Sequence, residues 1–457
     1  MGSIAAKAKR RIVSLIKSDG NRSEKIFKNV ILSFGVKGGS IIVGLLLVPM
    51  TINYINPIQY GIWLTISSVV SWMSFFDIGM GNGLRNKLAH AIALNEYENA
   101  RKYVSTAYAV LAMIAFALFV IFWLVNPHLN WNSLLSIPDT VKDNIQLVVL
   151  IIVGSFCVQF VVQTINVVLM ANQQPAISSL ILFVGQLGIL ATIFILKQTV
   201  VGTLTNLVLA LTILPIFALL IGSIYLYNNQ LKIFAPSFRS IDFKFAKNIL
   251  NLGGIFFVIQ IGAMLLFQTD NIIINKIIGP EAVTVFNVSY KLFSVVIMLF
   301  GILITPYWSA FTDAYSKQDF DWMQNKVYRM RIIWVILSLV GIPLLVFSSK
   351  FLFIFWLGHT VNIPPNLSIA MGLYTIGFTG MTLNCYFLNG IGKLKIQLYL
   401  YVVSCLINVP LSIYWASRAG VVGVVLVNTI IMFLMCIVLW IQINKILKNR
   451  AYGIWNK

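Results

Sequence analysis

Apolar runs long enough to cross a lipid bilayer recur along this 457-residue chain from Lys28 to its end. A helix needs about 20 mostly apolar residues to span the hydrocarbon core, where every backbone polar group must find its hydrogen bond within the protein. Hydrophobic residues make up 59% of the sequence and charged residues only 10%, and the mean hydropathy is +0.88. We therefore expect an all-α integral membrane protein.

Twelve transmembrane helices are expected, with centres near residues 42, 72, 113, 158, 187, 214, 261, 295, 341, 377, 407 and 432. Lysines and arginines indicate their orientation, because cytoplasmic connections collect these residues. The connections on one side, taken with both termini, hold 26 of the 33 cations, and the connections on the other side hold 5. Both termini are therefore predicted to be cytoplasmic. The net charge of +20 has the same origin, so nucleic acid is not expected as a partner.

The two halves of the chain resemble each other. The segment KNVILSFG at Lys28 recurs as KNILNLGG at Lys247, an offset of 219 residues, and INP at Ile55 is echoed by IGP at Ile278. We expect two pseudo-symmetric six-helix bundles around a central cavity that holds the substrate. The expected domains are a basic N-terminal segment 1–27, an N-terminal bundle 28–227, a cytoplasmic linker 228–247, a C-terminal bundle 248–444 and a basic tail 445–457.

The end of the second expected span, FDIGMGNGLRNK, is the most distinctive stretch of the sequence. On a helix, Asp77, Gly81 and Arg85 fall at i, i+4 and i+8 and share one stripe. Asp77 would then lie inside the hydrocarbon, where a carboxylate is costly unless it is paired or faces water. Arg85 would lie at the cytoplasmic rim.

Three more charged residues lie inside expected spans, namely Lys37, Asp270 and Lys291. Their depths permit two ion pairs, Lys37 with Asp77 near the cytoplasmic face and Asp270 with Lys291 near the outer face. In the structural interpretation, the pairs only neutralise buried charge. In the functional interpretation, the lysines hold an anionic head group and a carboxylate carries a proton or a sodium ion.

Amides inside the spans offer a second set of candidates. Gln159, Gln163 and Asn166 occur at i, i+4 and i+7 in the fourth span and make a polar stripe. Such a stripe suits sugar hydroxyls, and it suits helix packing equally well, because amides bridge helices in lipid. Amides of later spans, such as Asn271 and Asn408, are interpreted as packing residues.

The motifs of several enzyme classes are missing from the sequence. The three histidines form no HExxH pattern, no GxSxG elbow occurs, and Gly392 and Lys393 precede Leu394 where a Walker A motif needs Ser or Thr. The four cysteines lie in apolar segments without metal-ligand spacing. We expect no enzyme activity, no metal site and no cofactor.

The layout and four segments, KNVILSFGVKGGS, INPIQYGIW, FDIGMGNGLRNK and FQTDNIIINKIIGPEAV, together resemble one family. This is the bacterial lipid-linked oligosaccharide flippase family of the multidrug, oligosaccharidyl-lipid and polysaccharide exporter superfamily, and the resemblance covers the chain from about Lys28 to the end of the twelfth span. It implies alternating-access transport of undecaprenyl-pyrophosphate-linked repeat units of O-antigen or another surface glycan. The cargo would move from the cytoplasmic to the outer leaflet of the bacterial inner membrane.

The resemblance also implies roles for individual residues. Asp77 and Asp270 are candidates for ion coupling or gating, with H⁺ or Na⁺ as the hypothetical coupling ion. The candidate substrate-binding residues by this resemblance are Lys37, Lys291 and Arg85, and the polar stripe of the fourth span adds Gln159, Gln163 and Asn166. The expected partners are the lipid-linked oligosaccharide, membrane lipids, and a polysaccharide polymerase with its chain-length regulator. A monomer is expected.

Two rival functions stand beside this interpretation. A cation-coupled multidrug antiporter of the same superfamily would favour a cavity dominated by carboxylates, whereas two lysines balance two carboxylates here. A membrane-embedded glycan polymerase would need a large external loop with catalytic groups. The longest expected external connection, residues 126–144, offers few titratable side chains: His128, Asp139, Lys142 and Asp143.

Overall fold

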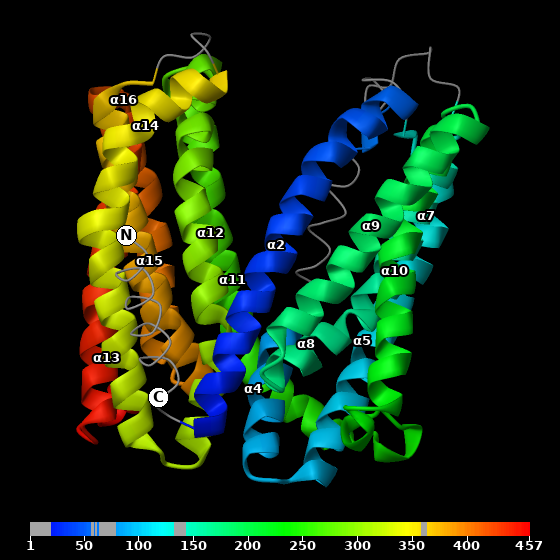
Figure 1. Ribbon diagram of the computed structural model, residues 1–457, viewed down its shortest axis with the longest axis horizontal. Helices are drawn as coiled ribbons and strands as arrows, with labels where there is room; N and C mark the ends of the chain where they lie inside the picture. The colour runs from blue at the N-terminus through cyan, green and yellow to red at the C-terminus, as the bar shows by residue number, and fades with distance from the viewer. Residues whose placement is uncertain (1–19, 56–58, 60–61, 64–78, 132–142, 358–362) are drawn as a thin grey trace, which may run out of the picture. The chain divides into compact units, whose positions relative to one another are not determined.

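The computed structural model describes residues 20–55, 59, 62–63, 79–131, 143–357 and 363–457, and all regular secondary structure in these residues is helical (Figure 1). Within this part of the chain, eight helices are long and apolar enough to cross a membrane. The prediction of an all-helical, multi-pass membrane protein is therefore confirmed. The chain divides into two compact units, Met1–Gly253 and Gly254–Lys457, which we describe separately.

The first unit is a helical bundle in which α9 packs against both α2 and α10. Its core forms because apolar residues recur at helical spacing. On α4, for example, Met80, Leu84 and Leu88 follow one another at intervals of four and are all buried. The helices of this unit are α2 (Gly20–Tyr54), α4 (Met80–Ala93), α5 (Tyr97–Val125), α7 (Ile145–Val162), α8 (Thr164–Ala171), α9 (Pro175–Thr199) and α10 (Leu204–Asn228), with short helices η2 (Asn126–His128), η3 (Lys232–Phe234) and η4 (Phe238–Ser240).

Polar side chains fix the connections at one end of the first unit. The Asn29 side chain donates to the Gln173 carbonyl oxygen and accepts from the Ala176 amide, so it holds the start of α9. The Thr106 hydroxyl donates to the Asp242 carbonyl oxygen and accepts from the Asp242 amide. These bonds attach the segment that leads into α11 to the side of α5.

The second unit is built around α15, which packs against α12, α14 and α16 and is buried along most of its length (Figure 1). A helix with apolar residues on all sides belongs in the middle of a bundle. The helices are α11 (Phe243–Ile277), which crosses the boundary between the units, α12 (Pro280–Ser316), α13 (Phe320–Ile336), η5 (Leu337–Gly341, a π-helical turn), α14 (Ile342–Leu357), α15 (Pro365–Ile391), α16 (Lys395–Leu447) and η6 (Gly453–Asn456).

The 53-residue helix α16 is two antiparallel segments. Gly420 has φ 61° and ψ −146°, a conformation outside the helical region that glycine adopts readily. The Asn408 amide donates to Asn428 Oδ1 at 2.6 Å. In a straight helix, residues 20 apart would be separated by about 30 Å. The hydrogen bond therefore requires the chain to reverse at Gly420, which agrees with separate spans centred near 407 and 432.

The expected span centres fall within helices, apart from residue 72, which lies outside the described residues. The predicted repeat has a structural counterpart in the turns between helices. Asn95 and Gln318 have φ 60° and 57°, and Gln173 and Gly392 have φ 58° and 73°. After each of these residues, the next amide donates to a carbonyl oxygen five positions back, at 2.8 to 3.1 Å, as in a Schellman motif. The sequence offsets of the two pairs are 223 and 219 residues, close to that of the repeat.

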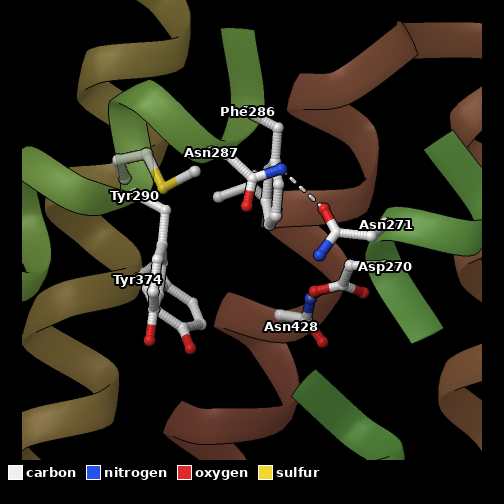
Figure 2. Close-up of a pocket in the computed structure, with 9 residues that line it drawn as sticks. Asp270, Asn271, Phe286, Asn287, Tyr290, Tyr374 and Asn428 are labelled. Carbon is white, nitrogen blue, oxygen red and sulfur yellow. Dashed lines mark hydrogen bonds between the residues drawn. The ribbon is translucent and has the colours of Figure 1, made fainter. Parts of the chain in front are cut away.

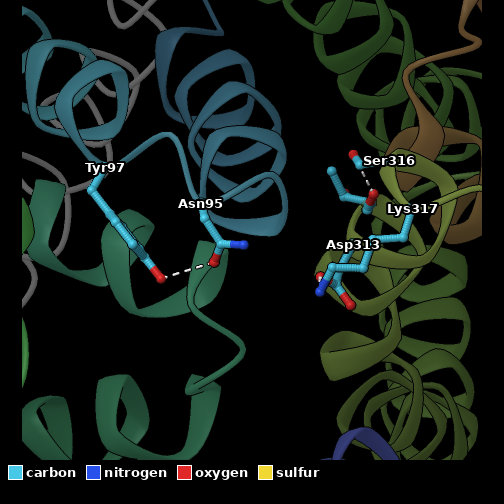
Figure 3. A network of polar contacts seen from close by, with 6 residues as sticks. Asn95, Tyr97, Asp313, Ser316 and Lys317 are labelled. Carbon is cyan, nitrogen blue, oxygen red and sulfur yellow. Dashed lines mark hydrogen bonds and ion pairs between the residues drawn. The ribbon is translucent and has the colours of Figure 1, made fainter.

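Side chains reinforce two of these turns (Figure 3). Asn95 Oδ1 accepts a hydrogen bond from the Tyr97 hydroxyl at 2.9 Å in the first unit. In the second unit, Lys317 forms an ion pair with Asp313 at 2.8 Å, four residues earlier. Different side chains thus support the same backbone turn in the two halves.

The crossing of α12 and α15 depends on the absence of a side chain at Gly390. A Cβ atom there would lie 2.5 Å from the Trp308 carbonyl oxygen. The Gly390 carbonyl oxygen also accepts a hydrogen bond from Thr312 at 2.6 Å. The two backbones are therefore held at a separation that only glycine permits.

We predict that Gly390→Ala destabilises the protein by about 1–3 kcal/mol, because the added methyl group must push two packed helices apart. The measurement is thermal unfolding of the purified protein in detergent. Gly301→Ala on α12 is the matched control, because a Cβ at Gly301 meets no atom within 4 Å. Equal melting temperatures for the two variants would show that this crossing is not tight.

Candidate functional site

A cavity of about 250 Å³ lies inside the second unit, where α11, α12, α15 and α16 meet (Figure 2). Most of the side chains that line it are polar or aromatic, although the helices that carry them are strongly apolar. A polar cavity among apolar helices is the usual form of a binding site in a bundle. Its lining residues are Asp270, Asn271, Phe286, Asn287, Tyr290, Met371, Tyr374, Val425 and Asn428.

Asp270 is bound to α16 through two successive hydrogen bonds. The Asn428 amide donates to Asp270 Oδ2 at 2.7 Å, and Asn408 donates to Asn428 Oδ1 at 2.6 Å. All three residues are buried, with exposed fractions of 4%, 2% and 0%. The second carboxylate oxygen, Asp270 Oδ1, has no hydrogen-bond partner.

The opposite side of the cavity is formed by α12 and α15. Asn287 and Tyr290 are three residues apart on α12, so both side chains face the same way. Asn287 donates to Asn271 Oδ1 at 2.8 Å, and the Tyr290 and Tyr374 rings pack edge to face with centroids 6.3 Å apart. Figure 2 shows the two tyrosine rings together on one side of the cavity and Asp270 with Asn428 on the other.

The cavity has a negative character. Of the nine described residues that line it, Asp270 carries the one carboxylate, and none is Lys, Arg or His. A buried carboxylate without a counter-charge is costly, and a bound cation or a proton removes that cost. The negative charge of the cavity disfavours the binding of a pyrophosphate group.

The ion pair between Asp270 and Lys291, which the sequence permits, is not formed in the structure. Both residues are described, yet Asp270 Oδ2 is bound by the amide of Asn428 and Oδ1 has no partner. Lys291 is exposed on α12. It follows Tyr290, which lines the cavity, and successive residues of a helix point about 100° apart. The sequence placed the two residues at a similar depth, but depth does not determine the direction of a side chain.

The other predicted site residues are spread over the first unit. Lys37 is exposed on α2, and Arg85 is buried near the start of α4 rather than exposed at a rim. Gln159 and Gln163 are half-buried around the end of α7. Asn166 Oδ1 accepts a hydrogen bond from Ser178 on α9 at 2.9 Å, which favours its packing role. Asp77, and with it the predicted pair with Lys37, lies outside the described residues.

Sequence reasoning missed Asn287, Tyr290, Tyr374 and Asn428 as lining residues, and it assigned Asn271 only to packing. One signal in the sequence was available. Asn287 and Tyr290 lie on one face of an otherwise apolar helix, close to the charged residue Lys291. For Asn428 there is no local signal, because its partner Asp270 is 158 positions away in the sequence.

The fold is that of a membrane transporter. It matches the outward-facing structure of a multidrug resistance MATE family transporter of the MOP superfamily with a TM-score of 0.74, over 96% of this chain and 98% of that chain, at 14% identity. In sequence, residues 256–414 match the MatE family and residues 26–312 match the family described as polysaccharide biosynthesis protein. This chain belongs to the polysaccharide biosynthesis protein family.

Two relatives align with nearly the whole chain. A Yersinia pseudotuberculosis protein, provisionally named an O-antigen export protein, is 23% identical over 412 residues, which cover 86% of this chain and 90% of the relative. A Salmonella typhimurium protein, provisionally named an O-antigen transporter, is 22% identical over 385 residues, with coverage of 82% and 86%. Both names describe transport rather than catalysis.

We predict that Asn428→Leu lowers the unfolding free energy by about 1–3 kcal/mol, because it leaves both Asp270 and Asn408 without their hydrogen-bond partner. Asn287→Leu changes an exposed amide of the same cavity and should cost less. Thermal unfolding of both variants in one detergent provides the comparison. A larger loss for Asn287→Leu would contradict a dominant role for the bonds between Asp270, Asn428 and Asn408.

Proposed function

We propose that this protein is an alternating-access flippase for undecaprenyl-pyrophosphate-linked oligosaccharide repeat units. It moves the repeat unit of O-antigen or another surface polysaccharide from the cytoplasmic to the outer leaflet of the bacterial inner membrane. The observation that carries this proposal is the alignment of nearly the whole chain with relatives named for O-antigen export and transport. In this proposal, twelve transmembrane helices form two six-helix bundles around a central cavity, both termini are cytoplasmic, and the protein catalyses no reaction.

The physical problem that such a flippase solves is the passage of a charged, hydrated head group through hydrocarbon. Pyrophosphate and sugar hydroxyls lose their hydration there unless the protein replaces it, whereas the polyprenyl tail can stay in lipid. We assign this role to cations and amides along the pathway. The proposed contacts are Lys37, Arg85 and Lys291 for the pyrophosphate and Gln159, Gln163 and Asn166 for the sugars, although Asn166 Oδ1 is already bound by Ser178.

We assign ion coupling to the cavity around Asp270, with Asp77 as a second candidate. Na⁺ is a hard cation that takes oxygen ligands, and Asp270 Oδ1 is an oxygen without a partner in a cavity that two tyrosines also line. A proton on the same carboxylate would also neutralise it. In either case, binding of the ion or proton to Asp270 alters the charge at the hydrogen bond between α11 and α16. The packing of those two helices would therefore respond to an ion gradient.

The second candidate function is a cation-coupled antiporter of small molecules. The MatE family match over residues 256–414 favours it, because this segment contains most of the cavity lining, including Asp270. The names of the relatives, which concern O-antigen, favour the flippase instead. A membrane-embedded glycan polymerase is the least favoured, because no relative named above is described as an enzyme.

We predict that Lys37→Gln and Lys291→Gln each slow flipping roughly tenfold or more, because each removes one charge-assisted contact with the pyrophosphate. The assay reconstitutes the protein into liposomes and follows a fluorescent undecaprenyl-pyrophosphate oligosaccharide between leaflets. Lys276→Gln, an exposed cation at the end of α11, is the matched control. Exchange of a cationic dye without any movement of the glycolipid would instead identify the antiporter.

We predict that Asp270→Asn makes flipping insensitive to the coupling gradient, because a neutral amide cannot exchange a proton or balance a Na⁺ charge. Wild-type liposomes are measured with a pH gradient or with a Na⁺ gradient, and the effective gradient identifies the ion. Asp270→Glu keeps the charge and should retain part of the response. A wild-type protein that ignores both gradients would refute ion coupling but not flipping.

A further inference from the structure

A second cavity, of about 430 Å³, forms an open groove on the surface of the second unit. It lies between α13 and the last residues of α16 and shares no lining residue with the acidic cavity. Amides, a phenol and three charged groups line it. The lining residues are Asp321, Gln324, Asn325, Val327, Tyr328, Arg331, Asn444, Leu447 and Lys448.

Arg331 is held rigidly in the wall of this groove. Its guanidinium group stacks on the Trp440 ring at 3.6 Å from the centroid, and Nη1 donates to Asn444 Oδ1 at 2.8 Å. The other two nitrogens, Nε and Nη2, are covered by protein and have no hydrogen-bond partner. Together they form the edge of the guanidinium that binds a phosphate or carboxylate with two parallel hydrogen bonds.

Arg331 forms no ion pair with any carboxylate in the part of the chain that the structure describes. Its hydrogen-bond partner, Asn444, is an uncharged amide. Asp321 shares the groove, but it precedes Arg331 by ten residues, or about 15 Å along the helix. A half-buried cation with unused donors therefore requires an anion from outside the chain.

The groove lies at a boundary between polar and apolar surface. The face of α13 that carries Gln324, Asn325 and Tyr328 continues beyond Arg331 as an exposed apolar face. Such a change along one helix marks the level of the lipid head groups, with acyl chains beside the apolar part. The exposed apolar residues of this face are Ile332, Val335 and Ile336, and Leu339 of η5 follows them.

We propose that this groove binds the phosphate head group of an anionic membrane phospholipid. Arg331 and Lys448 hold the phosphate, the neighbouring amides and Tyr328 contact the polar part of the head group, and the acyl chains lie along α13. Two cations and the carboxylate of Asp321 give the groove one net positive charge, which matches a singly charged phosphodiester better than a pyrophosphate. Because protein atoms cover Nε and Nη2, binding through them requires neighbouring side chains to move aside. The proposal needs only a membrane location and is independent of the transported cargo.

The test uses the purified full-length protein in detergent, titrated separately with phosphatidylglycerol and phosphatidylcholine of the same acyl chains. Melting temperature and native mass spectrometry report binding. Phosphatidylglycerol should raise the melting temperature of the wild type more than phosphatidylcholine. Arg331→Gln should weaken its binding about tenfold or more, as expected for the loss of a bidentate charged contact. Lys448→Gln, at an exposed residue, should weaken binding less and serves as the second variant if Arg331→Gln fails to fold.

Lys395→Gln is the matched control, because Lys395 is an exposed cation of the same helix as Asn444 and does not line the groove. It should bind phosphatidylglycerol as the wild type does. Unchanged binding in both Arg331→Gln and Lys448→Gln would overturn the proposal. An equal response to inorganic phosphate would overturn the lipid as the source of the phosphate. Tighter, Arg331-dependent binding of undecaprenyl pyrophosphate would overturn the phospholipid assignment.

Discussion

The hydrogen bond between Asp270 and Asn428 is the interaction on which the second unit depends most. Asn428 also accepts from Asn408, so one continuous set of side chains joins α11 to both segments of α16. These residues are almost completely buried, where each hydrogen bond is strengthened by the low dielectric and each lost bond leaves an unsatisfied group. The same bonds hold the helical hairpin at Gly420 together and leave one carboxylate oxygen without a partner. The residues that hold these helices together therefore also supply the proposed ion-coupling site.

The two cavities of the second unit have opposite charge, and this separates the ligands that they can hold. The inner cavity carries one carboxylate and no base among its described lining residues, so it suits a cation or a proton. The open groove between α13 and the end of α16 carries two bases and one acid and suits a phosphate group. Opposite charges keep the two ligand types apart, because an anion is repelled from the cavity around Asp270 and a cation is not attracted to the groove.

The helical class and the position of most spans could be predicted, because hydropathy and helix length are local properties of the sequence. Asp270 could also be selected as a candidate, since a carboxylate among apolar residues needs an explanation in any fold. The hydrogen-bond partner of Asp270 could not be predicted. Lys291 was expected to pair with Asp270 because the two residues have a similar depth in the membrane. The observed hydrogen bond from Asn428 depends instead on which face of α16 turns towards α11. That orientation is set by packing along the whole bundle, and Asn428 lies in a span that looks purely apolar in the sequence.

Arg331 shows a related limit of charge counting. Arg331 and Lys448 were two of the 26 lysines and arginines whose number predicted the cytoplasmic side. Such a count gives the same weight to a solvated lysine and to a fixed guanidinium group. The difference comes from Trp440 and Asn444, more than one hundred positions later, which hold the guanidinium in place and half-bury its charge. A chain that buries a cation without supplying a carboxylate depends on its surroundings for the anion. Phosphates are the abundant anions at a membrane surface, so the proposed phospholipid would supply the counter-charge that Arg331 lacks among the described residues.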